Sequence, residues 1–220
     1  MVDGLRSELV DSGVLGEPGA IHVGWNHNTH YHPLLLSRIP PGSRTALDAG
    51  CGYGEFAALL AAKGLTVDAV DSDPQAIANA RASHAGEKGL GFRQCSFVAG
   101  DCIRETYDVV TCIAALHHVD FAQGIAALQR AVSPGGTLLI LGLYREASAM
   151  DFAAAALAAP VNLALALRHG RAGTPDPMLT KVPPLSLAEV RTQAAILLPA
   201  ATIRRLLLWR YLLEWRRPRV

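Results

Sequence analysis

The chain has 220 residues, of which 50% are hydrophobic and 18% are charged, and its formal net charge is +1. This length accommodates one sizeable α/β domain, and the apolar content excludes an intrinsically disordered chain. The near-neutral charge provides no overall field that would attract nucleic acid, so nucleic acid is not an expected partner.

The N-terminus and the cysteines indicate the cellular compartment in which the protein is expected. Acidic side chains stand in the first residues, where a secretory signal would have basic ones before an apolar run, and no apolar stretch reaches membrane-spanning length. The cysteines form no C-x-x-C pair and have no partnered histidine spacing, so neither a zinc site nor a disulfide framework is expected. We therefore expect a cytoplasmic chain that does not associate with a membrane, with core thiols at Cys51, Cys95, Cys102 and Cys112.

Residues 1–40 are expected to form a cap segment ahead of the first strand. Ile21 to Tyr31 reads I-H-V-G-W-N-H-N-T-H-Y. No carboxylate or cysteine lies near its histidines in sequence, so no metal site is predicted. The segment contains, with the residue that follows it, half of the chain's histidines: His22, His27, His30 and His32.

The most informative stretch is Thr45 to Glu55, T-A-L-D-A-G-C-G-Y-G-E. A short apolar run, alternating glycines and a helix-period apolar pattern predict a strand, a tight turn and a helix. Glycine permits positive φ and close approach of the backbone to a ligand, so the turn is suited to a cofactor. A dinucleotide fingerprint would need glycine at position 55, and the Gly-Lys-Ser/Thr of a P-loop is absent, so both of these sites are disfavoured.

Strands and helices alternate after this turn. Asp71 closes the second strand, Asp73 is placed to cap the following helix, and Gly100-Asp101 ends the third strand. The expected helices are 55–63, 74–84 and 120–132, and the expected strands are 45–49, 66–71, 92–98, 107–113 and 137–143.

The last third of the chain is expected to hold two helical segments and a hairpin. The alanine-leucine run at 147–168 should form a pair of buried or lid helices broken at Pro160, within a lid or substrate region at 147–184. Ser186 should cap a helix that ends near Ile196. Alternating apolar residues predict an antiparallel hairpin at 201–217, and the arginines clustered there are interpreted as a solvated sheet edge more readily than as a polyanion site.

The order of these features resembles the class I S-adenosylmethionine-dependent methyltransferases. Asp48 precedes Gly-x-Gly-x-Gly, acids end the next two strands, and Pro-Gly-Gly precedes the fifth strand. The resemblance covers roughly 46–143. It implies a single 1–220 domain of the α/β class with a cofactor-binding core at 45–143. The implied fold is a doubly wound, Rossmann-like, mostly parallel seven-stranded sheet with a C-terminal antiparallel hairpin and helices on both faces.

The resemblance also implies which residues hold S-adenosylmethionine. The carboxylate of Asp71 would hold the ribose hydroxyls, and Asp101 would receive the adenine amino group. Asp48 has the alternative role of fixing the turn through backbone hydrogen bonds, and Asp73 is better explained as a helix cap. The candidate cofactor-binding residues are Asp48, Gly50, Cys51, Gly52, Asp71, Ser72, Gly100, Asp101, Cys102, Ile113, Trp25 and Asn28.

Methyl transfer from a sulfonium requires alignment of the nucleophile and exclusion of water, and a base is optional. A histidine is suited to take a proton near neutral pH, whereas helix packing is the alternative role of the His117-His118 pair. The cap has two interpretations, a segment that closes over the cofactor or a static anchor packed on the sheet. The candidate catalytic residues are His117, His118, His27 and Tyr31.

The sequence therefore predicts methylation of a small molecule at oxygen or nitrogen. Magnesium-dependent catechol-type enzymes have an acid just after the fourth strand, where this chain has Ala114-Ala115. Enzymes that methylate exocyclic nucleobase amines or glutamine side chains have Asp/Asn-Pro-Pro-Tyr there, so both subclasses are disfavoured. Two alternatives remain, a non-catalytic cofactor-binding partner or sensor, and a methyltransferase acting on RNA or protein.

Overall fold

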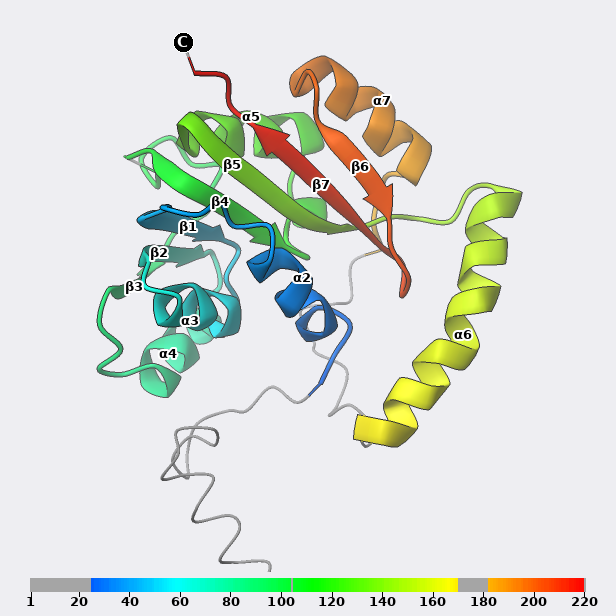
Figure 1. Ribbon diagram of the computed structural model, residues 1–220, viewed down its shortest axis with the longest axis horizontal. Coiled ribbons are helices and arrows are strands. Elements are labelled where there is room, and N and C mark those ends of the chain that lie inside the picture. The colour runs from blue at the N-terminus through cyan, green and yellow to red at the C-terminus, as the bar shows by residue number, and fades with distance from the viewer. Residues whose placement is uncertain (1–24, 104, 170–181, 220) are drawn as a thin grey trace, which may run out of the picture.

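The computed structural model describes residues 25–103, 105–169 and 182–219, and seven strands form one sheet with helices on both of its faces (Figure 1). The strand order is β3-β2-β1-β4-β5-β7-β6, in which β1 to β5 are parallel and β7 is antiparallel to both of its neighbours. This arrangement confirms the predicted doubly wound sheet and its antiparallel C-terminal hairpin. The strands are β1 (Thr45–Ala49), β2 (Thr66–Asp71), β3 (Leu90–Gln94), β4 (Tyr107–Ile113), β5 (Val132–Leu143), β6 (Thr202–Arg205) and β7 (Arg210–Arg216).

The helices pack against the sheet through two separate apolar clusters. Leu138 and Ile140 face α5 and α7, whereas Leu139 and Leu141 face α2 and α3, and all four leucine and isoleucine side chains are fully buried. A strand covered on both faces needs a continuous apolar run, which is what β5 has. The helical elements are η1 (Thr29–Tyr31), α2 (His32–Leu36), α3 (Glu55–Ala62), α4 (Pro74–Ser83), η2 (Leu116–His118), α5 (Phe121–Ala131), α6 (Ala149–His169) and α7 (Leu187–Leu197).

Two predicted helix caps are present. The Asp73 carboxylate accepts a hydrogen bond of 2.8 Å from the backbone N–H of Gln75, at the start of α4. Ser186 and Glu189 form a reciprocal capping box at the start of α7. These contacts satisfy backbone N–H groups that have no partner inside the helix, so both boundaries are set locally.

The third strand and the cysteines differ from the prediction. β3 ends at Gln94 instead of Val98, because Cys95 forms a disulfide with Cys102 and Phe97 turns into the core beside α5. The expectation of four core thiols without a disulfide was therefore wrong.

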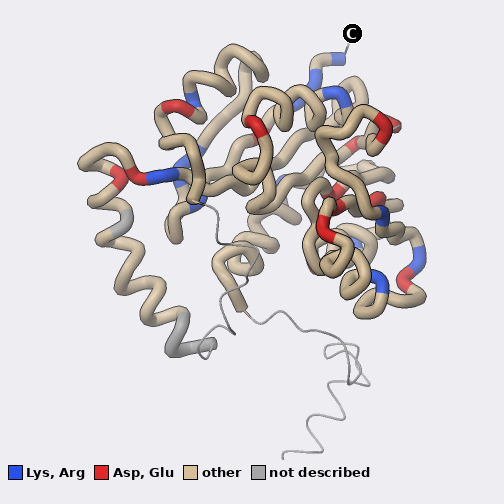
Figure 2. Tube along the Cα trace, turned by 180° about the vertical axis from the view of Figure 1, so that it is seen from behind, with Lys and Arg blue, Asp and Glu red and all other residues tan. Residues whose placement is uncertain are grey.

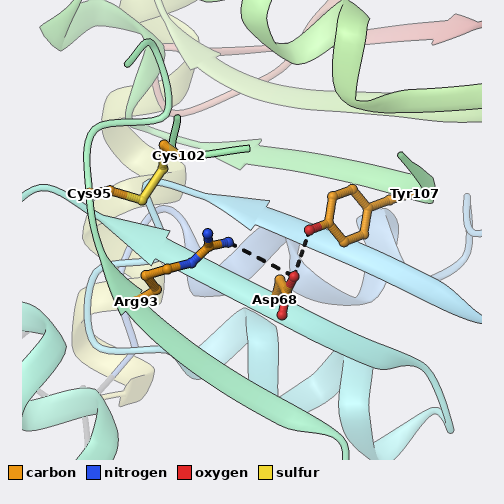
Figure 3. The surroundings of a disulfide bond; sticks show 5 residues. All are labelled: Asp68, Arg93, Cys95, Cys102 and Tyr107. Atoms are coloured by element: carbon orange, nitrogen blue, oxygen red, sulfur yellow. Dashed lines mark hydrogen bonds and ion pairs between the residues drawn. A yellow bond between two sulfur atoms is a disulfide. The ribbon is translucent and has the colours of Figure 1, made fainter. Parts of the chain in front are cut away.

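Figure 3 shows this disulfide next to β2 and β3, together with an ion pair and a hydrogen bond that meet at Asp68. The Tyr107 hydroxyl donates to Asp68 Oδ2 over 2.6 Å, and Arg93 Nη2 lies 4.0 Å from the same oxygen. These contacts link β2, β3 and β4, and the disulfide closes the segment that follows β3.

The prediction of two helices separated at Pro160 was also wrong. α6 is a single helix with Pro160 inside it, and it extends away from the sheet (Figure 1). A proline removes one helical hydrogen bond, but alanine and leucine on both sides are strong helix formers and continue the helix. Met150 and Leu157 are about 70% exposed, so the helix is not buried.

Charged residues are almost absent from α6. Figure 2 shows acidic and basic residues spread over the body of the molecule, whereas α6 carries none between Asp151 in its first turn and Arg168 near its end. Among the described helices, none is both long enough and apolar enough to cross a membrane.

The terminal hairpin turns without glycine. Leu208 and Trp209 adopt positive φ angles of 57° and 59°, a conformation that costs a non-glycine residue about 1 to 3 kcal/mol. The Tyr31 hydroxyl donates to Leu207 O over 2.9 Å, and Arg210 Nη1 donates to Leu208 O over 3.2 Å. Side chains from the cap and from β7 therefore hold this strained turn in place.

Candidate functional site

A cavity of about 330 Å³ lies at the carboxyl ends of β1, β2 and β4. The strand order changes direction between β1 and β4, which is where open α/β sheets bind their ligands. The walls of the cavity come from the glycine turn, the end of β2, the loop after β3, the end of β4 and the cap. Its lining includes Asn26, Asn28, His32, Asp48, Gly50, Cys51, Gly52, Glu55, Asp71, Ser72, Asp73, Ser96, Phe97, Ile113, Ala115 and His118.

The glycine turn is fixed to the end of β2 by backbone hydrogen bonds. Gly50 and Cys51 both donate to Val70 O, over 2.8 and 3.0 Å. A Cβ at Gly50, where φ is +73°, would lie 2.2 Å from the Ala115 side chain, so only glycine fits there. At Gly52, where φ is +54°, nothing lies within 4 Å of the corresponding point. The turn is thus packed on one side and open at Gly52.

Asp71 is a buried carboxylate at the end of β2. Its Oδ2 accepts from the Gly52 N–H over 2.9 Å, and its Oδ1 accepts from the Asp73 N–H over 2.9 Å. Each carboxylate oxygen has a second lone pair, and Asp71 lines the cavity. The residue therefore fixes the turn and can also accept hydrogen bonds from a ligand.

Asp48 is buried between β1 and β4. It accepts a hydrogen bond of 2.7 Å from the Thr111 hydroxyl. Burial raises the pKa of Asp48 to about 7, the Thr111 bond acts in the opposite direction, and the nearby Asp71 adds to the increase. This buried environment favours the structural role of Asp48, which is to fix the turn, over direct contact with a ligand.

Cys51 lines the cavity as a thiol that remains protonated. Burial raises its pKa, and the nearby Asp48 and Asp71 carboxylates raise it further. A thiol is nucleophilic as its thiolate, so Cys51 is suited to contact a ligand and is unsuited to attack one.

The loop after β3 meets the cavity through different residues from those predicted. Ser96 and Phe97 line it, whereas Gly100 and the exposed Asp101 do not, and Cys102 is buried in the disulfide. The cause is the early end of β3, which brings the first residues of the loop to the sheet edge. The two cysteines are seven residues apart and form no motif, so nothing in the sequence marked a closed loop here.

Only one of the two adjacent histidines reaches the cavity. His118 lines it, and His117 is 7% exposed and faces a separate small hollow that includes Leu185 and Tyr211. The two imidazole rings lie 4.0 Å apart between centroids. This placement makes His118 the stronger catalytic candidate of the pair.

The cap contributes Asn26, Asn28 and His32 to the cavity. Burial lowers the pKa of His32 to about 4, so this imidazole is neutral at neutral pH. Sequence reasoning did not single out Asn26, and no motif marks it.

Three other predicted cap residues lie outside the described cavity lining. Trp25 packs edge-on against His27, with 5.8 Å between ring centroids, and His27 Nε2 lies 2.8 Å from Asn162 Oδ1 of α6. The Tyr31 hydroxyl is bound to the terminal hairpin. The predicted His22 lies outside the described residues.

The described cavity lining includes four acidic residues and no lysine or arginine. Such walls favour a ligand with positive charge close to them. Across the described parts of the chain, no three His, Cys, Asp or Glu side chains gather closely enough to hold a metal ion. The acidic lining residues are Asp48, Glu55, Asp71 and Asp73.

Comparison with known proteins identifies the family. A family model described as a methyltransferase domain matches residues 47–138. An uncharacterized methyltransferase of Mycobacterium tuberculosis is 33% identical over 195 residues, which cover 88% of this chain and 98% of that protein. The chain belongs to the class I S-adenosylmethionine-dependent methyltransferases. It is an enzyme, and S-adenosylmethionine is its cofactor.

One further relative and one solved structure are informative for this methyltransferase. A ubiquinone biosynthesis O-methyltransferase of Thiobacillus denitrificans is 34% identical over 140 residues, which cover 57% of this chain and 60% of that protein. The solved structure of the PH0226 protein of Pyrococcus horikoshii superposes with a TM-score of 0.63 at 18% identity, covering 91% of this chain and 96% of that chain. The structural likeness establishes the shared fold alone.

The burial of Asp48 predicts a pH-dependent stability. Its folded pKa of about 7 is above the ordinary value of 3.8. Between these values the unfolded chain binds fewer protons, so the contribution of Asp48 to stability falls as the pH rises from about 4 to about 7. Asp48→Asn removes the ionisation and keeps an oxygen for Thr111. Denaturant unfolding should show a larger gain in stability for Asp48→Asn over wild type at pH 7.5 than at pH 5. An equal difference at both pH values would contradict the assignment.

Proposed function

We propose that the cavity binds S-adenosylmethionine and that the chain transfers its methyl group to an oxygen or nitrogen of a small molecule. The observation that carries the proposal is the position of the Asp71 carboxylate beside the open backbone at Gly52, at the point where strand order changes. When bound, the cofactor supplies a methyl group activated by a sulfonium. The chain's own residues bind the cofactor, place the methyl acceptor and take up its proton.

The adenosine end is proposed to lie against the ends of β1 and β2. The two oxygens of Asp71 retain acceptor capacity for two ribose hydroxyls, and the open backbone at Gly52 allows close approach. Phe97 and Ile113 offer apolar surface for a base, and Ser96 offers a hydroxyl. This assigns the adenine contacts to the first residues of the loop after β3 in place of Asp101.

The methyl acceptor is proposed to lie toward the cap and the end of β4. His118 lines this part of the cavity, and an imidazole is suited to take a proton from a hydroxyl or protonated amine as the new bond forms. His32 adds no charge there, because its pKa is low. The likeness to an O-methyltransferase of ubiquinone biosynthesis favours an oxygen nucleophile.

The cofactor position is tested by a matched pair of substitutions. Asp71→Ala removes charge-assisted hydrogen bonds, which contribute about 1.5 to 3 kcal/mol each, so the affinity for S-adenosylmethionine should fall at least about tenfold. Asp101→Ala makes the same chemical change outside the cavity and should leave the affinity within about twofold. Calorimetry measures both. Loss of binding in Asp101→Ala with none in Asp71→Ala would contradict the proposed position.

The reaction is tested with S-adenosylmethionine labelled on its methyl group. Incubation with a cell extract separated into small-molecule, protein and RNA fractions should place the label in the small-molecule fraction, with release of S-adenosylhomocysteine. His118→Gln should slow this transfer without changing cofactor affinity. Label confined to protein or RNA would show a different acceptor class. Binding with no transfer to any fraction would indicate a cofactor-binding partner or sensor.

A further inference from the structure

Arg210 is a buried arginine on the side of the sheet where the parallel strands end and the cavity lies. It is the first residue of β7, pairs with Leu143 at the carboxyl end of β5, and is only 4% exposed. Within the described residues, no carboxylate lies at ion-pair distance from its guanidinium. Every other described arginine of the hairpin strands is more exposed than Arg210. Burying a charge without an opposite charge costs free energy, so the burial of Arg210 needs a functional explanation.

The guanidinium is directed at the cap. Its Nε and Nη2 donate to a single oxygen, Asn28 Oδ1, over 3.0 and 2.8 Å, and its Nη1 donates to Leu208 O over 3.2 Å. The backbone of Asn28 is held as well, because its N–H donates to Asn26 Oδ1 over 2.8 Å and its carbonyl accepts from the Tyr31 N–H over 3.0 Å. Asn28 therefore has little freedom to turn.

These contacts fix the orientation of the Asn28 amide. A guanidinium has donors only, so the side of the amide that faces Arg210 must be its oxygen. The Nδ2 group, with two N–H donors, is the other branch of the planar amide and therefore points away from the guanidinium, and Asn28 lines the cavity. Burial lowers the pKa of Arg210 to about 10, so its positive charge persists at neutral pH behind these donors.

The remaining walls of the cavity are unsuited to a carboxylate. Their charged groups are acids, with no lysine or arginine among the described lining residues. The amino-acid end of S-adenosylmethionine carries a carboxylate, which needs donors and positive potential. Asn28, backed by Arg210, supplies both at the cap side of the cavity.

We propose that Arg210 is a positioning residue that fixes Asn28 so that the Nδ2 group of Asn28 donates to the carboxylate of the cofactor's methionine moiety. The inference rests on the proposed location of the cofactor in this cavity. The inference also accounts for the strained hairpin turn. Leu208 and Trp209, in left-handed conformations, place Arg210 beside the carboxyl end of β5. Hairpin and cap, 182 residues apart in sequence, thereby build one part of the site together.

The decisive variant is Asn28→Asp. The new carboxylate still accepts from Arg210, and as an ion pair, so the fold and its thermal stability should be retained. The Nδ2 donors are replaced by an oxygen that repels a ligand carboxylate. The affinity for S-adenosylhomocysteine should fall by about tenfold or more, whereas 5′-methylthioadenosine, which lacks the amino-acid end, should bind within about twofold of wild type.

Arg210 is tested in the same way. Arg210→Met should lower the affinity for S-adenosylhomocysteine with little change for 5′-methylthioadenosine. Arg210→Lys keeps the charge and has its donors on a single nitrogen, so it should restore part of the difference. A purely structural role would affect both ligands alike. The Arg210 variants also provide the test if Asn28→Asp does not fold.

Two outcomes would overturn the inference. One is unchanged S-adenosylhomocysteine binding in Asn28→Asp, and the other is an equal loss of affinity for both ligands. Failure of the wild-type chain to bind either ligand is a distinct result, because it would contradict the proposed cofactor site itself.

Discussion

The site depends on the hydrogen bonds that tie the glycine turn to the end of β2. Val70 O accepts from the backbone of Gly50 and Cys51, and the Asp71 carboxylate accepts from Gly52. These bonds fold the turn back over the sheet edge, and the approach of Ala115 to Gly50 leaves no room for a side chain there. The same carboxylate that closes the turn lines the cavity, so the residue that we propose for cofactor recognition also fixes the local fold.

Features set by local chemistry could be predicted from the sequence. The alternating glycines, the strand-closing Asp71 and the caps at Asp73 and Ser186 depend on neighbours a few residues away, and the structure has each where the pattern placed it. The continuous apolar run of β5 likewise indicated burial on both faces. The doubly wound, mostly parallel sheet with its antiparallel hairpin followed from the family resemblance together with this alternation of elements.

Features set by distant contacts could not be predicted. Phe97 is apolar and was assigned to a strand, but it is buried by α5 from a loop that a disulfide closes. Pro160 suggested a helix break, yet the flanking alanines and leucines continue α6 through it. Arg210 stood among arginines that looked like a solvated edge, and nothing local distinguishes the one that is buried against Asn28.

The central claim is that the cofactor lies between the glycine turn and the cap. Hydrogen exchange with and without S-adenosylhomocysteine tests it most directly, because bound ligand suppresses local opening. Added protection is expected at the amides of 50–54, 71–73, 96–97 and 26–32, with no change at the amides of α6. Protection of 26–32 would also show that the cap is coupled to the cofactor. Protection confined to α6 would contradict the account.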